Sequence, residues 1–170
     1  GLIKRVLLTP QAEMDGKLIG LLQKNSYAYA KVTPQEIESL VGRDAVHQGV
    51  CAELAEPLIY TKLEIALQRA ENGPTQPVFV LLDELQDPHN VGAIIRSAAA
   101  FGASGILMPE HDQVQVTPTV IKASAGAVFA LPIIHIGNIN TTLRNLKDKG
   151  YWTYALAGTG DTQLDKATFD

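Results

Sequence analysis

One arginine stands in the middle of an otherwise apolar helical pattern. The segment DPHNVGAIIRSAAAFGA runs from Asp87 to Ala103. Its larger apolar residues recur at the i, i+3, i+4, i+7 spacing of a helix that faces a core: Val91, Ile94, Ile95 and Ala98. Arg96 belongs to a different stripe, whose other members are all small: Gly92, Ala99, Ala100 and Ala103. A guanidinium in such a stripe has little to pack on, but it offers a permanent charge and a planar set of donors.

The start of this helix suits the binding of an anion. The sequence predicts Asn90 as the N-cap and Gly102 as the C′ residue. Helical side chains lean toward the N-terminus, so we expect Arg96 to reach back toward the loop that holds Asn90. Free N–H groups and a fixed cation would together hold an anion or a polarised oxygen. The alternative, equally open on these residues alone, is that Arg96 pairs with a nearby acid, and the candidates are Asp83, Glu84 and Asp87.

The elements around this helix predict a parallel sheet. Apolar strand patterns at 78–82, 105–108, 132–136 and 151–156 alternate with helices. One helix opens at Thr117-Pro118 and runs through Ser124, and another is capped by Asn140 and ends at Gly150. Alternation of this kind indicates an α/β fold with right-handed crossovers, in which ligands bind beyond the carboxyl ends of the strands. The loops after Leu82, Met108, Ile136 and Ala157 should therefore form one functional rim.

Common cofactor signatures do not appear. No G-x-G-x-x-G follows the first strand of this half, and there is no P-loop. The stretch Gly158-Thr159-Gly160 is either a bend that lets a ligand approach the backbone or simply a turn. The four histidines, His47, His89, His111 and His135, have no ligand spacing, so we expect no metal site.

The first half predicts a second, smaller α/β domain. Strands are expected at 3–8, 27–32 and 47–55, with helices at 11–24, from the capping box Thr33-Pro34-Gln35-Glu36, and at 61–71. Two prolines and a glycine at 71–77 indicate a linker. The sequence therefore predicts domains at 1–70 and 78–170.

A local basic edge in the first domain would contact phosphates, and its candidates are Lys4, Arg5, Lys24 and Lys31. The alternative is an ordinary solvated face. His47, before Gln48-Gly49, is either a packed turn histidine or a ligand or base.

Composition limits the class of protein. The chain has 170 residues, 46% of them hydrophobic and 19% charged, with a formal net charge of −4. We expect a soluble globular protein with no membrane span, and a charge of this sign argues against general nucleic-acid binding outside a local patch. The single cysteine, Cys51, is typical of a reducing, cytoplasmic compartment.

A longer motif adds a family resemblance. The pattern Asp87-Pro88-x-Asn90-x-Gly92-x-x-x-Arg96-Ser97-Ala98 resembles the first motif of the SpoU (TrmH-type) branch of the SPOUT RNA methyltransferases. The first half, including His47-Gln48-Gly49, resembles the L30e-like substrate-binding domain that precedes this catalytic domain. The resemblance implies a Rossmann-like α/β-knot fold and a homodimer. It also implies methyl transfer from S-adenosylmethionine to a ribose 2′-hydroxyl of RNA, above all of 23S-type ribosomal RNA.

The resemblance also implies roles for particular residues. Asn90 and Arg96 match catalytic positions, with Arg96 contacting RNA as well, and Ala157, Gly158 and Thr159 match a cofactor-contacting segment. The later knot motifs are absent, and the chain stops at Thr168-Phe169-Asp170, where the next strand is expected. We therefore expect a piece truncated before the knot and inactive alone.

Other functions remain to be weighed against this one. The same fold would suit a noncatalytic RNA-binding or interaction protein, or a methyltransferase of transfer RNA rather than ribosomal RNA. The long motif argues against an unrelated α/β nucleotide-binding enzyme.

Overall fold

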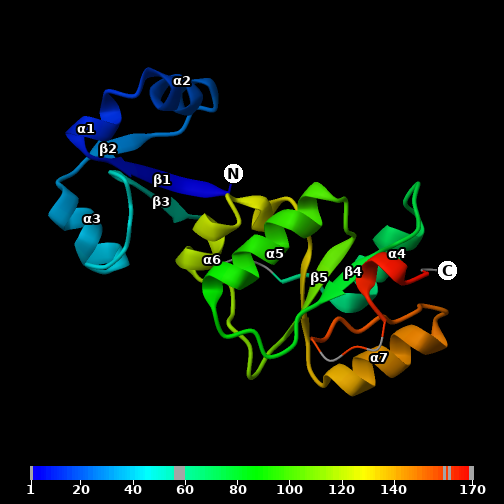
Figure 1. The fold of residues 1–170 in the computed structure, drawn as a ribbon. Helices are drawn as coiled ribbons and strands as arrows, with labels where there is room; N and C mark the ends of the chain where they lie inside the picture. Colours follow the sequence, from blue (N-terminus) through cyan, green and yellow to red (C-terminus); the bar gives the residue numbers. More distant parts are fainter. Residues whose placement is uncertain (1, 56–59, 159, 161, 169–170) are drawn as a thin grey trace. The chain divides into compact units, whose positions relative to one another are not determined.

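The chain folds into two compact units, Gly1–Ile59 and Tyr60–Asp170, in the computed structural model (Figure 1). The structure describes residues 2–55, 60–158, 160 and 162–168. Both units are α/β, as the sequence predicts.

The first unit is built on a three-stranded sheet in the order β2-β1-β3. β1 (Ile3–Leu8) runs parallel to β2 (Tyr29–Lys31) and antiparallel to β3 (Val50–Leu54). Three helices accompany the sheet: α1 (Pro10–Glu13), α2 (Gly16–Lys24) and α3 (Pro34–Val41). Val6, Leu8 and Leu22 form the buried centre, and removing their apolar surface from water stabilises this unit.

Side-chain caps determine where these helices begin. The predicted capping box of α3 is confirmed: Thr33 Oγ1 accepts a hydrogen bond from Glu36 N at 3.3 Å, and Glu36 Oε2 accepts one from Thr33 N at 2.7 Å. The single helix predicted at 11–24 is wrong, because the chain forms two helices there. Asp15 interrupts it by accepting from Lys17 N at 2.9 Å, so its carboxylate caps α2 instead of continuing α1.

The second unit is a parallel sheet in the order β4-β5-β6. Its strands are β4 (Phe79–Leu81), β5 (Gly105–Pro109) and β6 (Ile133–Ile136). The helices are α4 (Leu63–Glu71), α5 (Pro88–Ala100), α6 (Pro118–Ala123) and α7 (Ile139–Asp148), with short 3₁₀ turns η1 (Ala127–Phe129) and η2 (Leu164–Lys166). Figure 1 shows α5 and α6 on one face of the sheet and α4 and α7 on the other.

The helix α4 belongs to the second unit, which corrects the predicted domain boundary. Ala66 and Leu67 of α4 pack in one core with Leu107, Ile134 and Leu146. Residues 60–70 therefore do not belong with the first domain, where the prediction of a 1–70 domain placed them. The apolar face of α4 predicted burial correctly, but a periodic pattern does not say which sheet a helix covers.

Two predicted caps are also wrong. Asp87, not Asn90, is the N-cap of α5, and Asn138, not Asn140, is the N-cap of α7. Pro88 occupies the first helical position of α5, where its fixed φ and missing N–H fit, so the helix begins one turn earlier than Asn90 would allow. The predicted C′ glycines are confirmed at Gly102 (φ 74°) and Gly150 (φ 88°).

The fourth predicted strand, 151–156, does not form. Tyr151 packs edge-on against Phe79 of β4, with ring centroids 6.0 Å apart, but Trp152 and Leu156 are exposed. The residues have strand-like side chains, yet a strand needs a partner for its backbone groups. In the part of the chain that the structure describes, β4 pairs only with β5.

Candidate active site

Gly92, the glycine of the motif, allows α5 to pack closely against α6. Gly92 is buried, and a Cβ added there would lie 2.9 Å from Ser124 N and would also meet the Ala123 Cβ. The small residue therefore lets the end of α6 approach the α5 backbone directly. At Gly92 the stripe of small residues therefore has a close neighbour, which is another helix of the same unit.

The loops after β4 and β5 are joined by hydrogen bonds at the carboxyl edge of the sheet. Leu85 N donates to Gln113 Oε1 at 2.9 Å, and Val114 N donates to Leu85 O at 3.0 Å. Gln86 Nε2 adds a bond to Asp112 O at 2.8 Å. These bonds give the predicted rim a defined shape just before α5 begins.

A histidine on β6 extends the same network. Gln115 Nε2 donates to Pro109 O at 2.9 Å and to Gln113 O at 3.0 Å, so its Oε1 faces His135 Nε2 at 2.7 Å. The histidine must therefore carry a proton on Nε2. Tyr60 stacks on the imidazole, with ring centroids 3.4 Å apart.

Burial in this network lowers the pKa of His135, and Glu110 opposes the shift. Sequence reasoning missed this cluster, because Tyr60, Gln115 and His135 are distant in the chain and carry no motif.

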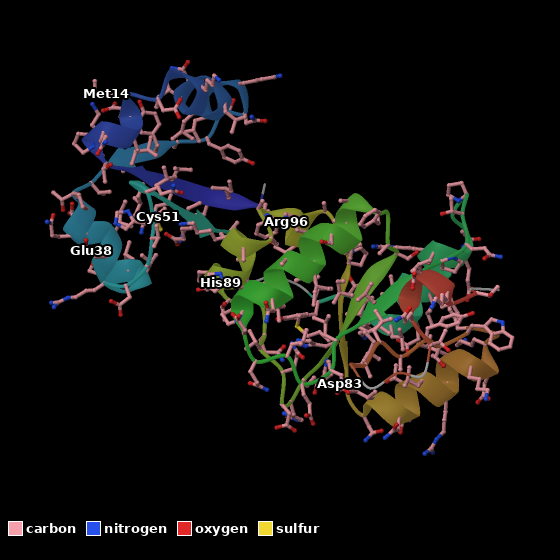
Figure 2. The ribbon with its side chains drawn as sticks, in the orientation of Figure 1. Met14, Glu38, Cys51, Asp83, His89 and Arg96 are labelled. Carbon is pink, nitrogen blue, oxygen red and sulfur yellow. The ribbon has the colours of Figure 1, made fainter. Side chains whose placement is uncertain are left out.

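Arg96 is exposed on α5 and has no ion pair or hydrogen bond within the described residues. The alternative in which it pairs with Asp83, Glu84 or Asp87 is therefore not what the structure shows. The Asp87 carboxylate instead accepts from His89 N at 2.8 Å as the helix cap. Figure 2 shows Arg96 and His89 on α5 and Asp83 well apart from Arg96.

Asn90 is exposed in the first turn of α5, directly after the rim. No hydrogen bond joins it to Arg96 in the described part of the chain. The two residues are six positions apart, which places them about 120° apart around a helix and about 9 Å apart along its axis. They therefore do not share a face of α5, and the expected convergence of Arg96 on the Asn90 loop is not present in this chain alone.

The predicted cofactor segment is an open turn. Gly160 N donates to Ala157 O at 3.1 Å, and Ala157 and Gly158 are both exposed. Nothing lies within 4 Å of a Cβ added at Gly158, so the turn can form one side of a ligand site but does not enclose one. Thr159 lies outside the described residues.

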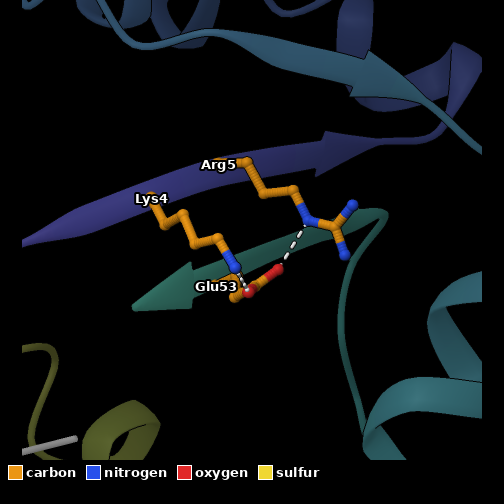
Figure 3. Close-up of polar contacts among 3 residues, drawn as sticks. All are labelled: Lys4, Arg5 and Glu53. Atoms are coloured by element: carbon orange, nitrogen blue, oxygen red, sulfur yellow. Dashed lines mark hydrogen bonds and ion pairs between the residues drawn. The ribbon is translucent and has the colours of Figure 1, made fainter. Parts of the chain in front are cut away.

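The predicted basic edge of the first unit is largely paired with acids. Lys4 Nζ lies 2.6 Å from Glu53 Oε1, and Arg5 Nε lies 2.5 Å from Glu53 Oε2 (Figure 3). These hydrogen bonds lower the pKa of Glu53. Both cations remain more than half exposed, so the phosphate of a ligand could still compete for them.

The other two basic residues lie elsewhere. Lys31 Nζ is 2.9 Å from Glu13 Oε1, and its backbone is in register with Leu8, at the far end of β1 from Lys4. Lys24 is exposed in the last turn of α2. The four cations are therefore distributed over the unit and do not form one free edge.

A groove on α5 lies away from the rim. It measures about 710 Å³ and is lined largely by apolar side chains, among them Val78, Ile94 and Phe101. Its residues come from β4 and the segment that leads into it, from the second half of α5 and from the turn after α5, so it opens at the amino edge of the sheet. Asn90 and Arg96 do not line it.

Two further findings concern the described residues. No three side chains of His, Cys, Asp or Glu are grouped there so that they could hold a metal ion. None of the helices there has the length and apolar character needed to cross a membrane.

Comparison with protein families identifies the family of this chain. Residues 77–170 match the SpoU rRNA Methylase family, and residues 1–59 match the family of RNA 2′-O ribose methyltransferase substrate binding domains. The chain belongs to the SpoU rRNA methylase family. The second match ends where the first structural unit ends.

Individual relatives agree with this assignment. The chain is 34% identical over 164 residues to the 23S rRNA (guanosine-2′-O-)-methyltransferase RlmB of Xylella fastidiosa, covering 94% of this chain and 65% of that protein. It is 38% identical over 136 residues to the putative TrmH family tRNA/rRNA methyltransferase YacO of Bacillus subtilis, covering 80% of this chain and 53% of that protein.

Among solved structures, the AdoMet-bound rRNA methyltransferase from Sinorhizobium meliloti is similar, with a TM-score of 0.58 and 27% identity. The match covers 85% of this chain and 51% of that one. The chain thus spans about half the length of several of the proteins it matches.

Proposed function

We propose that the protein containing this chain is an S-adenosylmethionine-dependent RNA methyltransferase that methylates a ribose 2′-hydroxyl, most directly in 23S-type ribosomal RNA. The observation that carries the proposal is Arg96, an exposed guanidinium without a partner in the described chain, at the family's motif position on α5. Family membership and the relatives' names support the activity and the RNA class. Transfer RNA is the second candidate substrate, because the Bacillus subtilis relative is named for both RNAs.

The chemistry explains why an arginine and an asparagine are useful here. A 2′-hydroxyl is a weak nucleophile. Its oxygen would bond to the methyl carbon as that carbon separates from the sulfonium sulfur of the donor, and its proton would pass to water. Arg96 would hold the neighbouring phosphate with two parallel donors or polarise the hydroxyl, and Asn90 would orient the ribose. Much of the acceleration would come from holding the two substrates in line.

S-adenosylmethionine supplies the methyl group when bound. The turn at Ala157 and Gly158 fits as one side of its site, because both residues are small and exposed and leave the backbone accessible. Thr159 would complete the segment. The rim would hold the reacting groups beside it.

The first unit would bind the RNA substrate. The substrate-binding match over residues 1–59 supports this role, with Lys4, Arg5, Lys24 and Lys31 as phosphate contacts. Three of these cations would exchange a carboxylate for a phosphate. Phosphate contacts release counterions from the RNA, so we expect binding that weakens as salt is added.

The complete protein would be a homodimer in the cytoplasm. Ala100 is exposed and Phe101 is 92% exposed at the end of α5, where a second copy would cover them. The free Cys51 is compatible with a reducing compartment.

The test is methyl transfer by the complete protein. Deproteinised 23S-type ribosomal RNA and bulk transfer RNA would each receive a labelled methyl group from S-adenosylmethionine, and the modified ribose would be mapped. Label at a 2′-oxygen of one RNA supports the proposal and identifies the substrate. Tight RNA binding without any transfer would instead favour a noncatalytic RNA-binding protein on this fold.

A further inference from the structure

One turn of the first unit places a glutamine in an unfavourable backbone conformation. Gln48 has φ 54° and Gly49 has φ 81°, and Val50 N donates to His47 O at 3.0 Å. Two consecutive positive φ angles closed by this bond define a type I′ turn. It lies directly before β3, and Leu8 on the neighbouring β1 is in register with Val50.

Glycine is required at the second position of the turn, because Gly49 packs closely on α1. A Cβ at Gly49 would lie 3.1 Å from the Ala12 Cβ and would overlap Thr9 Oγ1, and Thr9 N donates to Gly49 O at 2.9 Å. The packing therefore determines both the residue type and the place of the turn.

The first position has no such requirement. Asparagine, aspartate and glycine are the residues that normally occupy it, since the left-handed region is unfavourable for longer side chains. Gln48 is exposed, and its amide has no partner within the described residues. Its side chain therefore forms no hydrogen bond in the described chain that would offset the unfavourable backbone conformation.

The neighbouring histidine is held by the same turn. Gly49 N donates to His47 Nδ1 at 3.0 Å, so the neutral ring carries its proton on Nε2. That N–H also has no partner in the described part of the chain. The turn thus places an exposed, unpartnered amide, with donors and an acceptor, next to an imidazole N–H whose ring is held by Gly49 N.

We propose that the turn His47-Gln48-Gly49 reads the edge of an unpaired nucleobase in the RNA substrate, with the Gln48 amide as the specificity-determining group. This inference rests on the proposed RNA-binding role of the first unit. A neutral amide can form two parallel hydrogen bonds with a base edge, whereas a phosphate is better bound by a cation. Base edges are accessible mainly where RNA is not paired, because the deep groove of an RNA duplex hides them.

The experiment compares Gln48→Gly with a matched control, Ser26→Gly, in the 170-residue chain. Ser26 is also exposed, also in the first unit, and also has a positive φ, 56°. Both changes relieve the same backbone strain, so both should keep or raise the melting temperature. There are two binding probes. One is large-subunit ribosomal RNA transcribed in vitro, and the other is a perfectly paired RNA duplex.

We expect Gln48→Gly to bind ribosomal RNA about tenfold more weakly, as for the loss of one bidentate base contact, with duplex binding unchanged. Ser26→Gly should bind both RNAs as the wild type does. Unchanged ribosomal RNA binding by Gln48→Gly would overturn the inference and leave the proposed function standing. An equal loss on the duplex, or a fall in melting temperature, would also overturn it, by showing a phosphate contact or a structural role. Failure of the wild-type chain to bind ribosomal RNA at all would count against the RNA-binding role itself.

Discussion

Gly92 of α5 and Ser124 at the end of α6 are so close that a single methyl group on the glycine would lie 2.9 Å from the Ser124 backbone nitrogen. Ser124 is fully buried, and its Oγ donates to Ile121 O at 2.9 Å, so the α6 end has little freedom to retreat. The motif glycine therefore sets the distance between two helices, and the exposed arginine one turn later depends on that placement.

We expect Gly92→Ala to destabilise the second unit by about 1–2 kcal/mol. Alanine is favoured over glycine inside a helix, but overpacking against a rigid neighbour costs more than this gain. Chemical denaturation would measure the free energy of unfolding. Gly20→Ala is the matched control, because Gly20 is inside α2 and a Cβ there meets nothing within 4 Å. That change should stabilise the first unit slightly, and equal effects of the two changes would contradict the close-packing explanation.

The second prediction compares Asp87, the N-cap of α5, with Asn90 in the first turn of the same helix. Asp87→Ala should cost about 1 kcal/mol of stability, because it removes the acceptor for His89 N. Asn90→Ala should change stability by less than about 0.5 kcal/mol, since its exposed side chain caps nothing. Thermal melts of the two variants decide the point. A larger loss for Asn90→Ala would mean that Asn90 supports the helix start after all.

The third prediction concerns pH. Since burial lowers the pKa of His135, the unfolded chain binds more protons than the folded chain at pH values below about 6.5. The contribution of His135 is therefore complete above that pH and is lost as the pH falls toward its folded pKa. His135→Phe keeps an aromatic ring against Tyr60 and should reduce the fall in stability as the pH drops below about 6.5. Denaturation midpoints measured at several pH values would show this change in slope.

Gln115→Glu gives the contrasting variant for the same site. A carboxylate facing Nε2 favours the charged imidazole, so the acid side of the profile should flatten or reverse. Its absolute stability should also fall, because Pro109 O and Gln113 O lose their donor. Identical pH slopes in wild type and both variants would exclude His135 as the source of the dependence.

Local signals predicted most of the elements but not what they contact. The capping box of α3, the turn glycines and the apolar strands depend on neighbouring residues, and the structure has them near their predicted places. The placement of α4 and the absence of a strand at 151–156 depend on partners far along the chain. The network of Tyr60, Gln115 and His135 could not be predicted for the same reason.

The motif predicted that Asn90 and Arg96 lie on this helix, but it did not predict that their side chains lie on different faces of it. A helix fixes the direction of each residue from its position, and six positions bring these two to different faces. The reach of Arg96 toward the rim was inferred from the lean of helical side chains, which is too small to overcome that rotation. If Asn90 and Arg96 act together, the bound RNA or another part of the complete protein must connect the two faces of α5.

The last prediction concerns Arg96 itself. Arg96→Ala should leave the unfolding free energy within about 0.5 kcal/mol of wild type, because the side chain is exposed and bonds to nothing in the described chain. In the complete protein the same change should lower the single-turnover rate of methyl transfer about 100-fold or more, while RNA affinity stays nearly constant. Arg96→Lys should also fail, since an ammonium lacks the two parallel donors of a guanidinium. Melting curves, RNA titrations and single-turnover methylation on the same preparations provide the comparison. A variant that unfolds early yet still transfers methyl groups would make Arg96 a structural residue and would remove the main support for its catalytic role.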